Sequence, residues 1–315
     1  MSFLKKYKFK SNLFFSPMEA CSDVAIRTLC YEQGAALTYI EMIRAYALTK
    51  KKQRFLEKLD PSPNIRQGLQ LAAVKVNELK KTLVMIKTKQ QEQDPRFMHI
   101  ETIDLNLGCP SPGLISEGGG PALIKRTNRV KELFETLRST WEGPVSAKMR
   151  LGMTQQEKEK KLYLKILNVA EDIGIDWITI HPKTVKDPSR DPIDLRALQE
   201  CVENTSTPII GNGLVTDEVS AQTMLNTGVK GIMIARAAVA DPFIFKRINH
   251  FIETGKKLAQ PTKQDYEQAF KKYFEIATKA KILQYYIDYH ARMFQLKLDN
   301  KWDHFHSPKT MEQWT

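Results

Sequence analysis

Polar and reactive side chains in this 315-residue chain recur directly after short hydrophobic segments. In a barrel of parallel strands and helices, catalytic groups lie at the carboxyl ends of the strands and in the loops that follow. A solvated loop explains any one of these residues but not the whole set, so we expect them to form one site. The residues in such positions are Asn106, Cys109, Lys148, Arg150, His181, Asn212, Gly213 and Arg236.

The thiol of Cys109 stands between Gly108 and Pro110, just after a predicted strand. Free cysteines are often buried hydrophobic residues. Here, however, Ser111-Pro112-Gly113 and the triple glycine 118–120 follow, a composition typical of an exposed, movable loop. Such a loop suits an acid that approaches a bound substrate and then withdraws.

Lys148 and His181 offer several kinds of chemistry. A cation inside a barrel must be paired or must bind an anion, and a reduced flavin carries negative charge near one ring nitrogen. Lys148 could alternatively form a Schiff base, as lysines of aldolase barrels do. His181 could contact a phosphate or a ring, act as a general acid, or be structural.

Two glycine- or alanine-bearing turns, Gly211-Asn212-Gly213 and Ala235-Arg236-Ala237, follow the last two predicted strands. Barrels of this type often bind a phosphate at this place, through backbone N–H groups and a helix N-terminus. The pattern therefore predicts a phosphate site.

Eight short β-rich segments alternate with helical patterns, which predicts a (β/α)₈ TIM barrel, an α/β fold. The predicted strands are Leu13–Met18, Leu37–Met42, Asn64–Leu69, Thr102–Leu107, Val145–Leu151, Trp177–His181, Pro208–Gly211 and Gly231–Ala235. The predicted helices include Asp23–Gln33, Val130–Trp141, Gln155–Ile173 and Glu218–Asn226, each followed by a glycine stop.

The pattern changes after Asp241-Pro242. From Thr262, apolar residues follow the spacing of one helix face, and Thr262 with Asp265 resembles a capping box. We therefore expect a barrel domain over residues 1–245 and a small C-terminal helical domain over 246–315. From Phe245 to Thr315 the chain has 13 Lys and Arg against 8 Asp and Glu.

Composition narrows the class of protein. A formal charge of +12 favours a polyanionic partner, because phosphate contacts release counterions. No apolar run reaches the roughly 18 residues of a membrane span, and no secretory signal is apparent. The four cysteines lack metal-ligand spacing and are typical of reduced thiols, so we expect a cytoplasmic protein without a metal site.

Five motifs, together with Ser16-Pro17-Met18 near the start, make the chain resemble the tRNA-dihydrouridine synthases over nearly its whole length. These motifs are Asn106-Leu107-Gly108-Cys109-Pro110-Ser111, Ile40-Glu41-Met42-Ile43, Ala147-Lys148-Met149-Arg150-Leu151-Gly152, His181-Pro182-Lys183-Thr184 and Gly211-Asn212-Gly213.

The resemblance implies an enzyme that binds FMN at the barrel mouth, with NADPH or NADH reducing the bound flavin. The reduced flavin is then expected to pass hydride to C6 of a uridine in tRNA, and Cys109 to protonate C5. The resemblance further implies that Pro17 and Met18 underlie the flavin, with Gln67, Lys148 and His181 around its polar edge. Asn212, Gly213, Ala235 and Arg236 are then expected to hold the ribityl phosphate, and Asn106, Arg150 and Lys183 to face the uracil. The helical domain is expected to bind tRNA, and the protein is expected to act as a monomer.

Three positions depart from the family pattern: Lys183 stands where Arg is more common, Ala235 replaces a usual Gly, and Pro121 follows the triple glycine. Two other readings stay open. One is a flavin barrel that acts on a free pyrimidine, as dihydroorotate dehydrogenases do. The other is a non-catalytic tRNA-binding protein that keeps the barrel as a scaffold.

Overall fold

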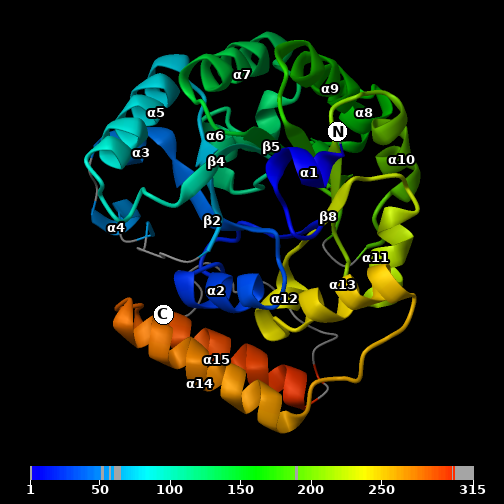
Figure 1. The fold of residues 1–315 in the computed structure, drawn as a ribbon. Helices are drawn as coiled ribbons and strands as arrows, with labels where there is room; N and C mark the ends of the chain where they lie inside the picture. Colours follow the sequence, from blue (N-terminus) through cyan, green and yellow to red (C-terminus); the bar gives the residue numbers. More distant parts are fainter. Residues whose placement is uncertain are drawn as a thin grey trace.

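Eight parallel strands close into a barrel in the computed structural model, which describes residues 2–50, 53–56, 58–59, 65–188, 191–299 and 301 (Figure 1). Each strand pairs with the next in the chain, and the last pairs with the first. The predicted (β/α)₈ barrel is therefore confirmed. The strands are β1 Leu13–Phe15, β2 Leu37–Arg44, β3 Gln67–Ala72, β4 Ile100–Leu107, β5 Val145–Gly152, β6 Trp177–Thr184, β7 Ile209–Asn212 and β8 Gly231–Ile234.

Helices surround the barrel, and the main hydrophobic core fills the layer between them and the sheet. They are α1 Phe3–Tyr7, α2 Val24–Glu32, α3 Ala45–Thr49, α4 Gln53–Leu56, α5 Val76–Gln91, α6 Pro112–Ser116, α7 Thr127–Thr140, α8 Gln155–Glu159, α9 Leu162–Ile173, α10 Leu195–Glu203, α11 Glu218–Leu225, α12 Arg236–Ala240, α13 Ile244–Thr254, α14 Lys263–Lys279 and α15 Gln284–Leu298, with a 3₁₀ turn at Gly120–Leu123. None of the described helices is both long and apolar enough to cross a membrane.

Local signals account for several helix ends. The Asp23 side chain accepts a hydrogen bond from the Ile26 N–H and so begins α2, and Thr262 with Asp265 forms the predicted capping box of α14. The single helix predicted over Gln155–Ile173 is wrong. Lys161 has a φ of 50°, a left-handed conformation that no helix continues through, so the segment forms α8 and α9.

Aromatic rings fill the barrel interior at the end where the strands begin. Tyr39 and Trp177 point inward from β2 and β6, and Phe14 points inward from β1. The N-terminal segment adds Tyr7 and Phe9. The ring of Phe9 lies edge-on to that of Phe14, with the ring centroids 5.3 Å apart. This plug closes the end at which the strands begin, so only the end at which they finish, the barrel mouth, is left for a site.

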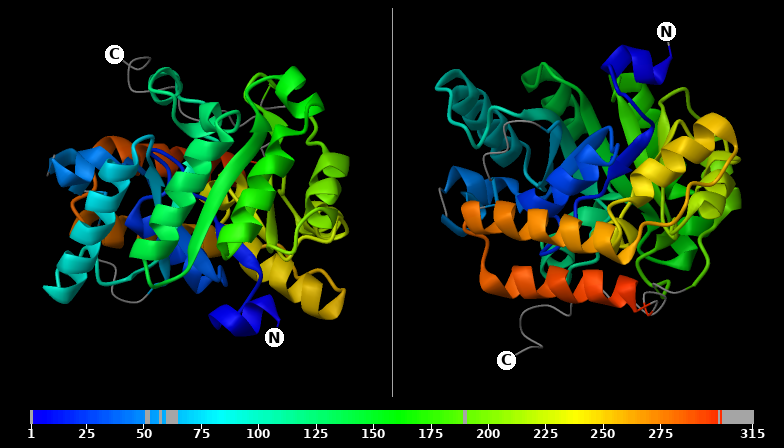
Figure 2. Two further views of the ribbon diagram at one scale, coloured as in Figure 1. Left: turned by 90° about the horizontal axis from the view of Figure 1, so that it is seen from above. Right: turned by 60° about the horizontal axis from the view of Figure 1, so that its bottom comes forward.

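The last two helices, α14 and α15, lie side by side beside α2 and α12 (Figures 1 and 2). Phe270 of α14 and Phe294 of α15 contact each other with ring centroids 5.6 Å apart. Helix α13 spans the boundary predicted at residue 245 and packs on the barrel helix α11, where Arg247 pairs with Glu218 at 3.0 Å. The division into a barrel and a helical domain stays a prediction.

Candidate active site at the mouth of the barrel

The predicted site residues of four strands converge at the barrel mouth because parallel strands end on the same side. Strand pairing places Asn106 of β4 beside Lys148 of β5, and Arg150 of β5 beside His181 of β6. Asn212 ends β7 beside Met233 of β8, and its side chain donates to the Met233 carbonyl at 2.8 Å.

The loop that bears Cys109 is held from two sides. The Oδ1 atom of Asn106 accepts hydrogen bonds from the Gly108 N–H at 3.2 Å and the Cys109 N–H at 2.9 Å. From the neighbouring strand, Nε of Arg150 donates to the Gly108 carbonyl at 3.1 Å. Cys109 is partly exposed, whereas the other three cysteines are buried. The backbone of residues 108 and 109 is therefore fixed, while the side chain of Cys109 stays partly exposed.

The environment of Cys109 keeps its thiol protonated. Burial raises the pKa of Cys109, and the carboxylate of Glu19 adds to this effect, while Lys148 and Arg150 oppose it. A raised pKa keeps the thiol in the protonated form from which a proton donor must start, and it is unsuited to a nucleophilic thiolate.

Two cations at the mouth form no hydrogen bond or ion pair among the described residues, although the carboxylate of Asp104 acts on Lys148 without touching it. Burial and the charge of Arg150 lower the pKa of Lys148 to about 8, so the amine is still mostly charged near neutral pH. Among the described residues, neither Lys148 nor Arg236 of α12 makes a side-chain hydrogen bond or ion pair. Because a partly buried cation without an ion pair is costly, these two groups fit a bound anion.

His181 is uncharged in this setting. Burial lowers its pKa well below the usual range, and the charges of Lys148, Arg150, Lys183 and Arg236 lower it further. Its ring packs against Gly213, where an added Cβ would lie 2.8 Å from a ring carbon and where φ is +123°. Glycine is therefore required there on both counts.

The three residues expected to face a uracil are partly engaged by the protein. Nη1 of Arg150 donates to the Thr184 carbonyl at 2.9 Å. The buried Lys183 ammonium donates to the Pro188 carbonyl at 2.7 Å. Asn106 uses its carboxamide oxygen on the Cys109 loop, as above. Each keeps at least one further N–H donor for a ligand.

The assignment of Gln67 to the flavin edge is wrong. Gln67 lies at the amino end of β3, is 2% exposed, and accepts a hydrogen bond from Nε of Arg27 in α2, so it points outward from the barrel. Strand β3 begins three residues later than predicted, and Asn64 lies outside the described residues. An odd shift exchanges the two faces of a strand, so Gln70, not Gln67, points into the barrel.

Sequence reasoning also missed Asp104, which is fully buried on the inner face of β4. Its carboxylate accepts from Nε2 of Gln70 at 2.8 Å and from Oγ of Ser146 at 2.6 Å. Burial raises the pKa of Asp104 to about 6, against the effect of these hydrogen bonds and of Lys148. An acidic residue in a predicted parallel strand was the available signal.

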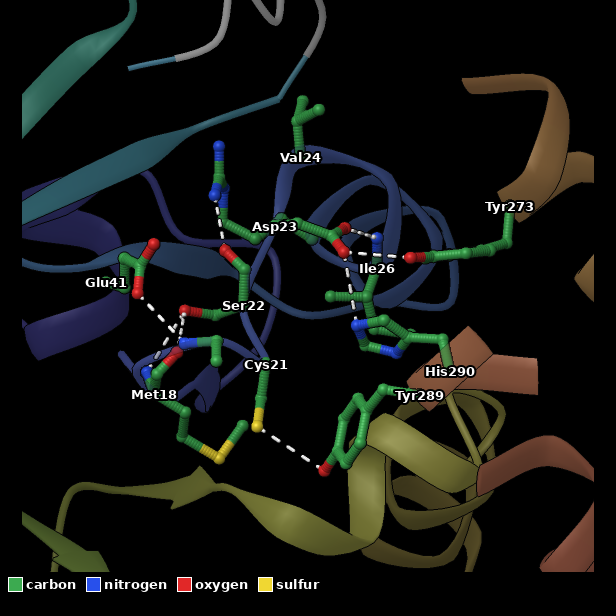
Figure 3. Close-up of polar contacts among 12 residues, drawn as sticks. Met18, Cys21, Ser22, Asp23, Val24, Ile26, Glu41, Tyr273, Tyr289 and His290 are labelled. Carbon is green, nitrogen blue, oxygen red and sulfur yellow. Dashed lines mark hydrogen bonds and ion pairs between the residues drawn. The ribbon is translucent and has the colours of Figure 1, made fainter. Parts of the chain in front are cut away.

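The segment between β1 and α2 joins the mouth to the C-terminal helices (Figure 3). It covers residues 16–23 and includes Pro17 and Met18, which are expected to underlie the flavin. Glu41 of β2 accepts a hydrogen bond from the Ala20 N–H at 2.9 Å. Further along, the Cys21 thiol lies 3.4 Å from the Tyr289 hydroxyl of α15. The segment therefore links the barrel mouth directly to α15.

A closed barrel with reactive groups gathered at its mouth places the chain among barrel enzymes. The dihydrouridine synthase family model matches residues 14–310, so the chain belongs to the dihydrouridine synthase family. This confirms the predicted family and the predicted oxidoreductase class.

Curated relatives agree. The chain is 31% identical to tRNA-dihydrouridine synthase B of Klebsiella pneumoniae over 80% of this chain and 75% of that protein. It is 30% identical to the protein of that name from Escherichia coli K12, over 80% and 76%. The old yellow enzyme from Trypanosoma cruzi matches with a TM-score of 0.53 at 11% identity, over 82% of this chain and 92% of that one, which shows that the fold is shared.

Proposed function

We propose that this chain is an FMN-dependent tRNA-dihydrouridine synthase, which uses NADPH or NADH to reduce the C5–C6 bond of uridines in tRNA. The observation that carries this proposal is the presence, at one barrel mouth, of a protonated thiol, Cys109, and of two cations, Lys148 and Arg236, that form no ion pair among the described residues. The family membership and the names of its relatives support the substrate.

The residues at the mouth fit FMN, which carries a phosphate and an anionic ring when reduced. Lys148 and His181 would lie along its polar edge, and Pro17 and Met18 beneath it. Asn212, Gly213, Ala235 and Arg236 would hold the phosphate, because β7 and β8 are neighbours and their ends meet. When bound, the flavin supplies the hydride that reduces C6 of the uracil.

The protein's own groups supply the proton and the orientation. Cys109 donates its proton to C5 of the uracil, and the thiolate that remains is stabilised by Lys148 and Arg150, the two cations that act to lower its pKa. The free N–H groups of Asn106, Arg150 and Lys183 would bind the uracil carbonyls. Cys109 then recovers a proton from solvent.

Recognition of tRNA falls to α14 and α15 in this proposal, and the target uridine must leave its stack to reach the mouth. The positive excess of residues 245–315 supports this role. We further propose that residues 1–245 and 246–315 act as separate domains of a cytoplasmic monomer.

The decisive experiment compares the wild-type protein with Cys109→Ala on tRNA from cells that lack dihydrouridine synthases. We expect both proteins to retain FMN, seen as flavin absorbance in the blue region of the visible spectrum. The rate of dihydrouridine formation by the variant should fall at least about 100-fold, which is within the usual range for loss of a general acid. Cys201→Ala, a change at a buried cysteine, is the matched control. Undiminished turnover by the Cys109 variant overturns the assigned role, and absence of flavin from both proteins overturns the proposed function.

A further inference from the structure

Two chains of hydrogen bonds inside the barrel end on one carboxylate, Asp104. The first runs from the mouth: the N–H groups of Gly108 and Cys109 donate to Asn106, whose Nδ2 donates to Oε1 of Gln70 at 2.7 Å, and Nε2 of Gln70 donates to Asp104. The side chains of Asn106, Gln70 and Asp104 along this path are at most 5% exposed.

The second chain runs from the aromatic plug. Nε1 of Trp177 donates to the Tyr39 hydroxyl at 3.2 Å, which lies 3.4 Å from Oγ of Ser146, and that hydroxyl donates to Asp104. Because Trp177 can only donate and an ionised Asp104 can only accept, every hydroxyl in this chain has one consistent direction.

The same argument fixes both amides of the first chain. A carboxylate forces Gln70 to present its NH₂ group to Asp104, which leaves Oε1 for Asn106. Asn106 must then present its own NH₂ group to Gln70, which leaves Oδ1 for the two loop N–H groups. If Asp104 presented a donor instead, both amides would turn over, and Asn106 would oppose two N–H groups with a third donor.

We propose that Asp104 is a positioning residue: as an acceptor at the end of this chain, it sets the orientation of Gln70 and Asn106 and thereby holds the loop that bears Cys109. Its importance for turnover rests on the proposed function, but its hold on the loop does not. Asp104 also faces Lys148, whose charge it helps to maintain.

The test uses the full chain and measures hydrogen–deuterium exchange at pH 8, where Asp104 is ionised. In Asp104→Asn, the Tyr39 hydroxyl still donates to Ser146, which leaves the hydrogen of Ser146 for residue 104, so the new amide turns its oxygen to Ser146 and its NH₂ group to Gln70. We therefore expect the amides of Gly108 and Cys109 to exchange about tenfold faster. The matched control is Ser146→Ala, which removes the hydroxyl donor of the second hydrogen-bond chain and leaves the Asp104 carboxylate in place as acceptor. Hydrogen exchange in the Cys109 loop should therefore stay within about twofold of wild type. Peptides from β7 and β8 serve as the internal reference.

The double variant Asp104→Asn/Gln70→Glu separates this role from a merely structural one. In it, the new amide at position 104 donates to the new carboxylate at position 70. That carboxylate also accepts from the NH₂ group of Asn106, so Asn106 again offers its oxygen to the loop. We expect loop exchange to return to within about threefold of wild type.

The proposal is overturned if folded Asp104→Asn keeps wild-type loop exchange, or if the double variant exchanges as fast as Asp104→Asn. If the single variant does not fold, the double variant alone decides, because restored protection supports the proposal and lost protection contradicts it. Failure of the proposed function, shown by the absence of flavin from the protein, leaves these exchange results unchanged.

Discussion

Nε2 of His290 lies 3.1 Å from a carboxylate oxygen of Asp23, and that oxygen also accepts a hydrogen bond from the Tyr273 hydroxyl at 2.9 Å (Figure 3). The other carboxylate oxygen of Asp23 begins α2 by accepting from Ile26 at 3.0 Å. One side chain therefore caps a barrel helix and binds both C-terminal helices. Burial alone would raise the pKa of Asp23, but the charge and hydrogen bond of His290 and the other hydrogen bonds hold the pKa below its ordinary value.

Replacing Asp23 should weaken the whole junction. We expect Asp23→Ala to lower the free energy of unfolding by about 2–4 kcal/mol at pH 7, since it removes a cap and leaves buried donors unpaired. Urea unfolding measures this change. Because the pKa of Asp23 is lowered on folding, its contribution is full above the ordinary value near 4 and is lost as pH falls through the folded pKa, so the difference between the proteins should shrink below about pH 4.

Tyr273→Phe serves as the control for this junction, because it removes one hydrogen bond and keeps the ring stacked on Phe270. We expect a loss of about 1 kcal/mol. A loss for Asp23→Ala no larger than that for Tyr273→Phe would contradict the view that Asp23 joins three helices.

Gly213 is a position in the candidate site at which an added methyl group should be harmful. Gly213→Ala combines a positive φ with a clash against His181, so we expect a loss of stability of about 2–4 kcal/mol, seen in thermal unfolding. Gly174→Ala is the matched control, because φ there is +78° but no atom lies within 4 Å of the added carbon. Its loss should be only about 1–2 kcal/mol. Equal losses would show that the contact with His181 is unimportant.

Much of the architecture follows from local sequence signals. Hydrophobic segments such as 145–151 and glycine stops such as Gly174 mark the strands and helices, and parallel strands then bring Lys148 and His181 to one mouth. The partners of these side chains depend on pairing across strands distant in sequence, which periodicity does not report. Asp104 joins Gln70 and Ser146, 34 and 42 residues away, so the sequence marks it as an acidic residue in a strand but does not show its partners.

The error at Gln67 has the same origin. Residues 64–66 are polar at two of three positions, so the sequence does not show whether the strand begins at 64 or at 67. A shift of three residues in the register of this strand moves every side chain to the other face of the sheet.

This correction leads to a direct comparison of two glutamines. Gln70→Ala should lower turnover of tRNA at least about tenfold, because it interrupts the chain that holds the Cys109 loop. Gln67→Ala should leave turnover within about twofold, since its contact with Arg27 lies on the outer face of the barrel. Steady-state dihydrouridine formation measures both. The reverse order of effects would restore Gln67 to the site.

The proposed tRNA surface of α14 and α15 is tested by its charge. Lys279 ends α14 and Lys281 follows it, and both are exposed. Because each phosphate contact contributes through the release of counterions, Lys279→Glu/Lys281→Glu should weaken tRNA binding about tenfold or more at about 0.1 M salt and make the dependence of the affinity on salt less steep. FMN binding should not change. The matched control is Lys160→Glu/Lys165→Glu, at two exposed lysines just after α8 and on α9, helices that lie across the barrel from α14 (Figure 1). If the control weakened tRNA binding equally, only net charge would matter, and the proposal that α14 and α15 recognise tRNA would be wrong.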